Sequence, residues 1–333
     1  MSKIEEYRPN KYCLYENDAT YPEKGLRGLN WKGRLKFNSI LFKDSRKLDR
    51  LYKQALSTKE CYLGPFWGEF GNFLLHFLPF VLHLSDLGIK VNVICLEHYK
   101  PFFRNIAGNY IYNEFHSLSK SLIESAPSAN HLKIVPKEFS AVCEKAKQKS
   151  KETGTPFYDL SDSNLYWYSF RNWQLYNKQV FLDLKRVREK SNKVVLFSRV
   201  KGPAYTPNNG ERLNYVDVAN LLSDYFDEVV VAGLPEMSAD AEFKNPKIVN
   251  KVGGNETVLQ ECAEAKLIVS QHSGAIHVGL YSNTPTLIIY KGVLPIKGLD
   301  DTLRFRKNAN QPLYLATSDM ETRKFLGIFR SEN

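Results

Sequence analysis

One carboxylate in the N-terminal half of the chain stands between two glycines. Gly68 and Gly71 bracket Glu69, after an apolar run over 60–66 and before an apolar stretch over 72–87. Glycines allow a tight turn and let the backbone approach a ligand closely. A carboxylate in such a loop can take the proton of a hydroxyl nucleophile, which is the task of a general base. The spacing by itself favours a simpler role, in which Glu69 caps the following helix.

A second loop carries cations just after an apolar, β-branched run over 193–199. Ser198 and Arg199 end this run, and Lys201 and Arg212 follow in a loop that also contains glycine and asparagine. Guanidinium and ammonium groups at the end of a strand suit a diphosphate. A solvated basic surface loop accounts for them equally well.

A third loop combines small residues with two histidines. Ser273, Gly274 and Ala275 lie where a predicted strand ends and a helix begins. Backbone N–H groups at such a turn can hold an anion. His272 and His277 flank the turn. A lone histidine is more often structural, but beside a turn of this type a structural role and a ligand contact carry equal weight.

Strands and helices alternate around these loops. The C-terminal half predicts strands over 193–199, 228–234, 247–252, 266–270 and 284–290, with helices over 215–226, 256–265 and 274–281. Asn255 is expected to cap the helix over 256–265. The N-terminal half predicts a strand over 60–66, a helix over 72–87 and a strand over 90–96. This alternation indicates an α/β protein with two Rossmann-like halves and parallel sheets, which bind ligands at the carboxyl ends of their strands.

These patterns divide the chain into four segments. Residues 1–55 show little periodicity and are expected to form an N-terminal elaboration. Two Rossmann-like domains are predicted over 56–175 and 176–315, followed by a C-terminal helix over 316–333. The aromatic-rich segment 159–192 is predicted to connect the domains and pack between them, although its rings could also stack on a base or a sugar.

Composition limits the class of protein. The 333 residues are 43% hydrophobic and 25% charged, with a net charge of +10. These proportions are globular, and the basic balance favours polyanions, phosphorylated small molecules or an anionic membrane face. The basic residues are scattered, so nucleic acid is not an expected partner. The motifs Asp-x-Asp, GxxxxGK[ST] and GxGxxG are missing, which disfavours metal-anchored sugar transferases, P-loop NTPases and dinucleotide oxidoreductases.

Three features bear on the compartment. No apolar stretch follows the N-terminal charges, so we expect no secretory signal. The most apolar window, 73–84, is shorter than the roughly 20 residues that span a bilayer. The five cysteines contain no CxxC pair, so neither a disulfide framework nor a structural zinc site is expected. We expect a cytoplasmic protein that is able to contact the inner face of a membrane.

The stretch over 248–292 resembles the C-terminal core of the ADP-heptose:lipopolysaccharide heptosyltransferase family. That family's pattern is a glycine, a short helix, a strand, Asp-Thr-Gly-Pro-Met-His and a small-residue helix that ends in Thr-Pro. The same order is found here in Gly253, the predicted helix over 256–265, Ser273 to His277, and Thr284-Pro285. The segment 67–79 is similar to the family's Gly-Asp loop and the Leu-Pro helix after it.

The resemblance implies a GT-B glycosyltransferase, in which two Rossmann-like domains face each other across a cleft. Such an enzyme inverts configuration without a metal or cofactor, and its C-terminal domain holds the nucleoside-diphosphate sugar. Glu69 takes the position of the base, and Arg199 and Lys201 fall at the diphosphate contacts. The predicted donor-side set is Ser198, Arg199, Lys201, Arg212, Gly233, Gly253, His272, Ser273, Gly274, Ala275 and His277, and the acceptor-side set is Gly68, Gly71 and Asn72. The implied acceptor is a glycan, a lipid-linked or a phosphorylated molecule, as in the biosynthesis of lipopolysaccharide or another polysaccharide.

Two positions depart from the family pattern. His272 and Glu69 each stand where the family has an aspartate, so the donor sugar is not carried over. The turn at 273–275 also resembles the Asp-Ser-Gly-Gly turn of hydrolysing UDP-N-acetylglucosamine 2-epimerases. The alternatives are therefore a sugar-nucleotide epimerase or hydrolase, and a non-catalytic protein that binds nucleotide sugars.

Overall fold

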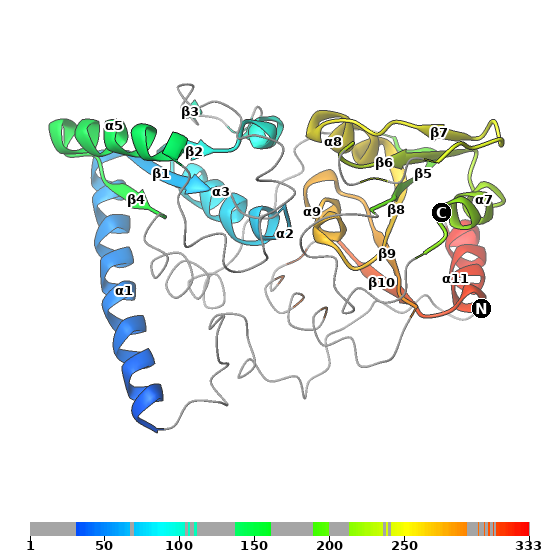
Figure 1. Cartoon of the computed structure of the whole chain (residues 1–333), viewed down its shortest axis with the longest axis horizontal. Helices are drawn as coiled ribbons and strands as arrows, with labels where there is room; N and C mark the ends of the chain where they lie inside the picture. The colour runs from blue at the N-terminus through cyan, green and yellow to red at the C-terminus, as the bar shows by residue number, and fades with distance from the viewer. Residues whose placement is uncertain are drawn as a thin grey trace. The chain divides into compact units, whose positions relative to one another are not determined.

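The computed structural model describes residues 31–66, 70–103, 106, 110–111, 137–160, 189–199, 213–235, 238, 241–291, 299, 303, 306, 309 and 311–332 (Figure 1). They form two compact units, which we describe separately. The N-terminal unit takes the described residues from 31 to 160 together with Arg306. The C-terminal unit takes those from 189 to 303 and from 309 to 332.

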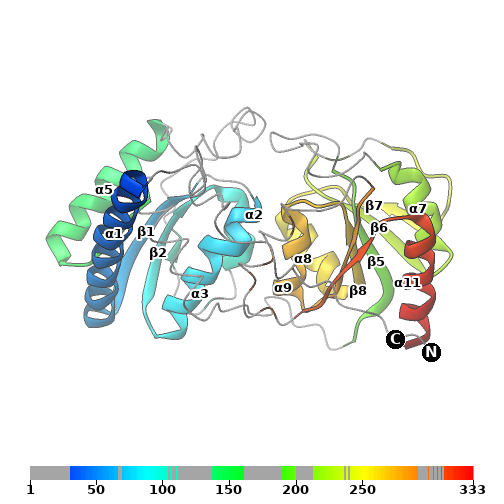
Figure 2. The same cartoon turned by 90° about the horizontal axis from the view of Figure 1, so that it is seen from below.

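The N-terminal unit is built on a parallel sheet with the strand order β3-β2-β1-β4. Six of the seven residues of β1 are buried, as expected for a parallel strand covered on both faces. Helix α3 lies on one face of the sheet and α5 on the other (Figure 2). The strands are β1 (Glu60–Phe66), β2 (Lys90–Cys95), β3 (Tyr110–Ile111) and β4 (Phe157–Asp159), and the helices are α1 (Trp31–Thr58), α2 (Phe70–Asn72), the π-helix η3 (Phe73–Phe77), α3 (Leu78–Asp86), the 3-10 helix η4 (Glu97–Phe103) and α5 (Lys137–Thr153).

The C-terminal unit has a six-stranded parallel sheet with the order β10-β9-β8-β5-β6-β7. Its first strand lies in the centre, the next two continue on one side and the last three on the other, which is the strand order of a Rossmann fold. Helices α7 and α11 cover one face of the sheet, and α8 and α9 cover the other (Figure 2). The strands are β5 (Ser191–Phe197), β6 (Glu228–Ala232), β7 (Ile248–Asn250), β8 (Ala265–Ser270), β9 (Thr286–Ile289) and β10 (Leu313–Ala316), and the helices are α7 (Tyr215–Ser223), α8 (Asn255–Glu264), the 3-10 helix η8 (Gly274–His277), α9 (Gly279–Ser282) and α11 (Asp319–Glu332).

A buried lysine ties α8 to the sheet of the C-terminal unit. Lys193 Nζ, in β5, donates to Glu261 at 2.9 Å and to Glu264 at 2.8 Å. Lys251 Nζ donates to the other oxygen of Glu261 at 2.8 Å, and Glu228 of β6 lies 3.6 Å from Lys193. Burial lowers the pKa of Lys193, but the hydrogen bonds to Glu264 and Glu261 outweigh burial and raise it. The Lys193 ammonium is therefore held by carboxylates at the amino-terminal edge of the sheet.

The predicted α/β class with two parallel, Rossmann-like sheets is confirmed, and the predicted strands match β1, β2 and β5 to β9 within a few residues. The prediction that Asn255 caps a helix is wrong. The preceding Gly254 takes the cap position in an extended conformation, and Asn255 is the first helical residue, with a buried side chain. The helix predicted over 274–281 is a 3-10 turn followed by one short α-helical segment.

The structure also corrects the expectation for residues 1–55, where the sequence shows little periodicity. Residues 31–58 form the helix α1. Its buried side is narrow in the part where side chains are described. Leu48 and Ala55 are buried there, and Tyr52 Oη lies 3.1 Å from His83 Nε2 of α3. The segment 161–188, which includes most of the predicted connection, lies outside the described residues. No helix in the described part of the chain is long and apolar enough to cross a bilayer.

Replacement of Gly279 by alanine tests the packing of α9 on β9. A Cβ atom there would lie 2.3 Å from the Thr284 carbonyl oxygen and 2.8 Å from Thr286 Oγ1. We expect Gly279→Ala to lower the free energy of unfolding by about 1–3 kcal/mol, as overpacking does. Gly327→Ala in α11 is the control, because a Cβ there meets no atom within 4 Å and should raise stability by about 1 kcal/mol. Chemical denaturation measures both, and equal effects would contradict the packing described.

Candidate functional site

The C-terminal unit has a switch point between β5 and β8, its two central strands. The chain leaves β5 toward β6 on one side, whereas β8 leads to β9 on the other. In open parallel sheets, the crevice at the carboxyl ends of two such strands is the usual ligand site. Ser198 and Arg199 follow β5 there, and the turn from Gln271 to Ala275 follows β8. The pairing of β5 with β8 thus brings together two of the predicted donor-side loops.

A tyrosine hydroxyl joins these two strand ends. Tyr215, at the start of α7, is 4% exposed. Its Oη lies 2.7 Å from the Arg199 carbonyl oxygen and 2.8 Å from the side-chain oxygen of Gln271. A hydroxyl has one proton, so it donates to one of the two, and a Gln271 amide turned by 180° would donate to it in return. Tyr215 therefore holds the backbone of Arg199 at the edge of the switch point.

Sequence reasoning missed both Tyr215 and Gln271. The only local signal is that Tyr215 directly follows Asn214, whose side chain caps α7 by accepting from the Val216 N–H at 3.1 Å. A tyrosine just inside a helix whose amino end faces the carboxyl edge of the sheet can reach back to the strand ends.

Ser198 directly follows β5 and carries a hydroxyl that has no hydrogen-bond partner among the described residues. Its side chain is 0% exposed, and Ser198 Oγ is buried. Buried polar atoms are nearly always bonded in native proteins, so an exception calls for a ligand, an ion, a water or a functional reason. This atom lies at the carboxyl edge of the central strand, where the sequence predicts a donor contact.

Two predicted glycines extend this edge to β6 and β7. Gly233, after β6, has a φ of +145°, and a Cβ there would lie 2.3 Å from Ser238 Oγ. Only glycine fits this conformation and approach. Ser238 forms a bridge with Arg199, and the Gly253 N–H donates to the Gly233 carbonyl at 2.9 Å. The residues predicted after β5, β6 and β7 are thus linked by backbone contacts.

The turn after β8 is held by its own serines. Ser273 Oγ accepts from the Ala275 N–H at 3.3 Å and lies 3.3 Å from Ser270 Oγ. The Ser273 hydroxyl therefore uses one of the amides that the sequence assigned to an anion. Ser273, Gly274, Ala275 and His272 are partly exposed, whereas His277 is 1% exposed. The structure therefore does not expose His277 beside the turn.

Four predicted residues lie outside the described part of the chain: Gly68, Glu69, Lys201 and Arg212. The positions on either side of Glu69 are described. β1 ends at Phe66, and α2 begins at Phe70. Since β2 pairs with one side of β1 and β4 with the other, β1 also lies at a switch point. The acceptor-side residues Gly71 and Asn72 form the rest of α2 and are partly exposed.

Packed aromatic rings fix both ends of the Glu69 loop. Phe66 and Phe73 both contact Tyr99, and the Phe73 and Tyr99 rings are stacked with centroids 3.9 Å apart. Phe70 lies 5.8 Å from Phe102 and is parallel to Tyr99. The π-helix η3 begins directly after α2, and such irregular turns are frequent at functional sites. The described residues on either side of Glu69 are therefore packed in an apolar aromatic cluster.

The titratable groups of the N-terminal unit add one further candidate. His98 follows β2 at the same edge of the sheet, and burial lowers its pKa to about 4, so that its ring is neutral at pH 7. Cys61 and Cys95 are buried and free, and burial raises the pKa of both thiols. The described residues contain no cluster of histidine, cysteine or carboxylate side chains that could hold a metal ion.

No protein-family model matches the chain, and no curated protein matches it. The chain is similar to several solved glycosyltransferase structures. One is ADP-heptose lipopolysaccharide heptosyltransferase II of E. coli, with 12% identity and a TM-score of 0.47 over 82% of this chain and 98% of that one. Another is a family 9 glycosyltransferase from Veillonella parvula, with 12% identity and a TM-score of 0.44 over 82% and 88%. A third is E. coli heptosyltransferase WaaC with ADP-2-deoxy-2-fluoro heptose, with 11% identity and a TM-score of 0.44 over 82% and 99%. The heptosyltransferases that the sequence resembles are thus also among the structures to which the chain is similar.

Tyr215→Phe tests the link between the two strand ends. It removes the hydroxyl and keeps the ring, so the Arg199 carbonyl and the Gln271 amide each lose this contact. We expect the free energy of unfolding to fall by about 1–3 kcal/mol, the cost of unsatisfied buried groups. Ser198→Ala is the matched control, because removal of a buried hydroxyl without a partner should raise stability by about 1 kcal/mol. The assignment fails if denaturation curves show the two variants shifted in the same direction.

Proposed function

We propose that the protein is a glycosyltransferase that moves a sugar from a nucleoside-diphosphate donor to a hydroxyl of a glycan or glycoconjugate. The observation that supports it is the arrangement at the β5–β8 switch point. Cation-bearing and small-residue loops that the sequence assigns to a diphosphate follow these two strands at one edge. A diphosphate needs such an edge, because backbone amides, hydroxyls and cations must converge on it.

In this proposal the C-terminal unit stabilises the leaving group. Arg199, held through its backbone by Tyr215, would pair with the diphosphate together with Lys201. Ser198 and Ser273 would supply hydroxyl donors. Groups preset to meet the charge that develops on the departing diphosphate lower the barrier without a metal ion, and we propose no metal or cofactor.

Glu69 is the proposed general base. Its carboxylate takes the proton of the acceptor hydroxyl while that oxygen attacks the anomeric carbon. The bond from this carbon to the diphosphate oxygen breaks, and its electron pair leaves with the nucleoside diphosphate. Attack opposite the leaving group inverts the anomeric configuration. Gly68, Gly71 and Asn72 would border the acceptor.

The proposed acceptor is a glycan, a lipid-linked or a phosphorylated molecule, and the proposed location is the cytoplasm at the inner face of a membrane. The net charge of +10 supports an anionic or membrane-displayed acceptor. Surface polysaccharides such as lipopolysaccharide are products of this type.

Calorimetry against a panel of nucleoside diphosphates and nucleotide sugars tests the donor site. We expect one base to be selected, and Arg199→Ala to weaken binding by about 10- to 100-fold, the worth of a charge-assisted contact. Arg323→Ala, in the exposed part of α11, removes the same charge from the same unit and should leave affinity unchanged. Absence of binding across the panel, or equal losses in both variants, would overturn the donor assignment.

Turnover of the selected donor with an acceptor tests the base. Glu69→Gln keeps the size of the side chain but cannot accept the proton, so we expect turnover to fall by about 10²- to 10⁴-fold. Donor affinity should stay unchanged, and a chelator should have no effect on the wild-type rate. Full turnover by Glu69→Gln would falsify the assignment. Release of free or isomerised nucleotide products without an acceptor would instead support a sugar-nucleotide hydrolase or epimerase.

A further inference from the structure

Among its described side chains, helix α1 presents an exposed stripe in two parts, one at residues 31–35 and the other at residues 46–53. The stripe consists of Trp31, Leu35, Arg46, Arg50 and Lys53, all of which are exposed. At 3.6 residues per turn, these five positions fall within roughly 100° of the helix circumference, and the exposed Asp49 falls in the same sector. The buried Leu48 and Ala55 project from the opposite side, so the stripe lies away from the side of α1 that packs on the N-terminal unit.

The amino-terminal end of the stripe is apolar. Trp31 is 67% exposed and Leu35 is 60% exposed, and they lie one helical turn apart. Among the residues described, only Met320 is another large apolar side chain with comparable exposure. Lys32 Nζ lies 5.6 Å from the centre of the Trp31 ring. Tryptophan and lysine side chains are typical of protein segments that lie at the boundary between lipid headgroups and acyl chains.

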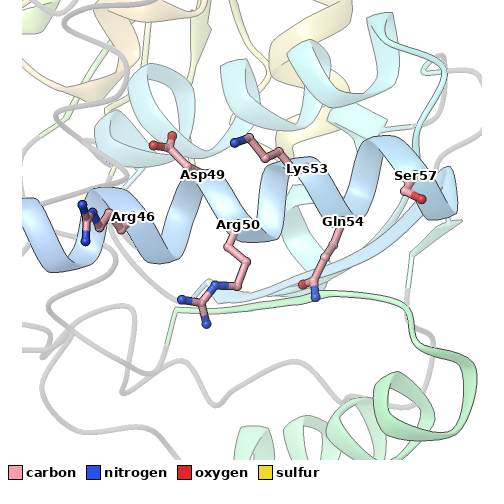
Figure 3. Close-up of a pocket in the computed structure, with 6 residues that line it drawn as sticks. All are labelled: Arg46, Asp49, Arg50, Lys53, Gln54 and Ser57. Atoms are coloured by element: carbon pink, nitrogen blue, oxygen red, sulfur yellow. The ribbon is translucent and has the colours of Figure 1, made fainter.

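The other end of the stripe is basic. Arg46, Arg50 and Lys53 line an open pocket of about 530 Å³, whose remaining lining is Asp49, Gln54 and Ser57 (Figure 3). Figure 3 shows Asp49 and Lys53 extending from one side of α1, and Arg50 and Gln54 from the other. In the described part of the chain, neither Arg50 nor Lys53 forms an ion pair with a carboxylate.

This pocket suits an extended anionic surface better than an enclosed ligand. Small-molecule sites are mostly apolar concavities that bury the ligand, whereas all six lining residues here are polar or charged and come from one helix. The whole of α1 has eight lysines and arginines against two aspartates, a net charge of +6 within a chain of +10. The helix therefore carries more than half of the excess positive charge.

We propose that the α1 stripe binds an anionic lipid bilayer. Trp31 and Leu35 enter the headgroup region, while Arg46, Arg50 and Lys53 contact lipid phosphates about 22 Å further along the helix axis. A duplex phosphate backbone would match the cations but not the tryptophan and leucine exposed on the same side. The proposal rests on α1 alone, so it stands or falls independently of the transferase chemistry.

Co-sedimentation of the full chain with vesicles tests the stripe. Binding is expected with mixed phosphatidylcholine and phosphatidylglycerol, not with phosphatidylcholine alone, and should weaken as salt is added. Each cation at an anionic surface is worth about fivefold in affinity, so Arg46→Gln/Arg50→Gln/Lys53→Gln should bind about 100-fold more weakly. Trp31→Ala/Leu35→Ala should also bind more weakly, because it removes the apolar anchor.

The matched control removes the same charge from another exposed helix. Arg323→Gln/Lys324→Gln/Arg330→Gln alters α11 of the C-terminal unit and should retain vesicle binding. Equal losses in the two triple variants would overturn the proposal, as would equal binding to both kinds of vesicle or binding of duplex DNA in place of vesicles. Wild-type-like nucleoside-diphosphate affinity in the α1 triple variant separates the failure of membrane docking from failure of the donor site.

Discussion

Parallel pairing of β5 with β8 is the constraint on which the C-terminal unit depends. Val194, Val195 and Leu196 pair in register with Leu267, Ile268 and Val269, although about 70 residues separate the two strands. Parallel strands end at the same edge, so this register alone brings the loop after β5 to the turn after β8. The Tyr215 hydroxyl can then span both ends. A slip by one residue would reverse the faces of β5 and break this contact.

The N-terminal unit repeats the same arrangement with different chemistry. β1 lies between β2 and β4. Its backbone packs closely against β2 at Gly64, which has a φ of +140° and where a Cβ atom would lie 2.3 Å from the Ile94 carbonyl oxygen. Phe66 and Phe70, the described residues on either side of Glu69, both pack against the Tyr99 ring. Each unit thus offers one loop after its first strand, cationic in one and acidic in the other. In the proposed reaction, the cationic loop would stabilise the leaving group and the acidic loop would supply the base.

Local patterns predicted β1, β2 and β5 to β9, because buried parallel strands are continuous apolar runs such as Val229–Val231. The edge residues were predicted for the same reason, since they directly follow those runs. The same patterns did not give the bounds of the shorter strands β3, β4 and β10. The hydrogen bonds of Lys193 and Tyr215 were not predicted, because their partners lie far away in sequence and come close only through the strand order. Asn255 was misassigned because Gly254, with no side-chain cap, starts the helix one residue earlier. The charged residues around Leu48 and Ala55 hid the narrow buried side of α1.

Buried polar groups at the two edges of the C-terminal sheet differ in whether they have hydrogen-bond partners. At the amino-terminal edge, the Lys193 ammonium is bonded to two carboxylates, so its burial is compensated within the unit. At the carboxyl edge, Ser198 Oγ is equally buried but has no partner in the described part of the chain. A core selected for stability alone would replace such a hydroxyl, since alanine would occupy the position without the desolvation cost. A buried hydroxyl without a described partner at the switch point is therefore what a site shaped for a ligand, rather than for folding, would retain.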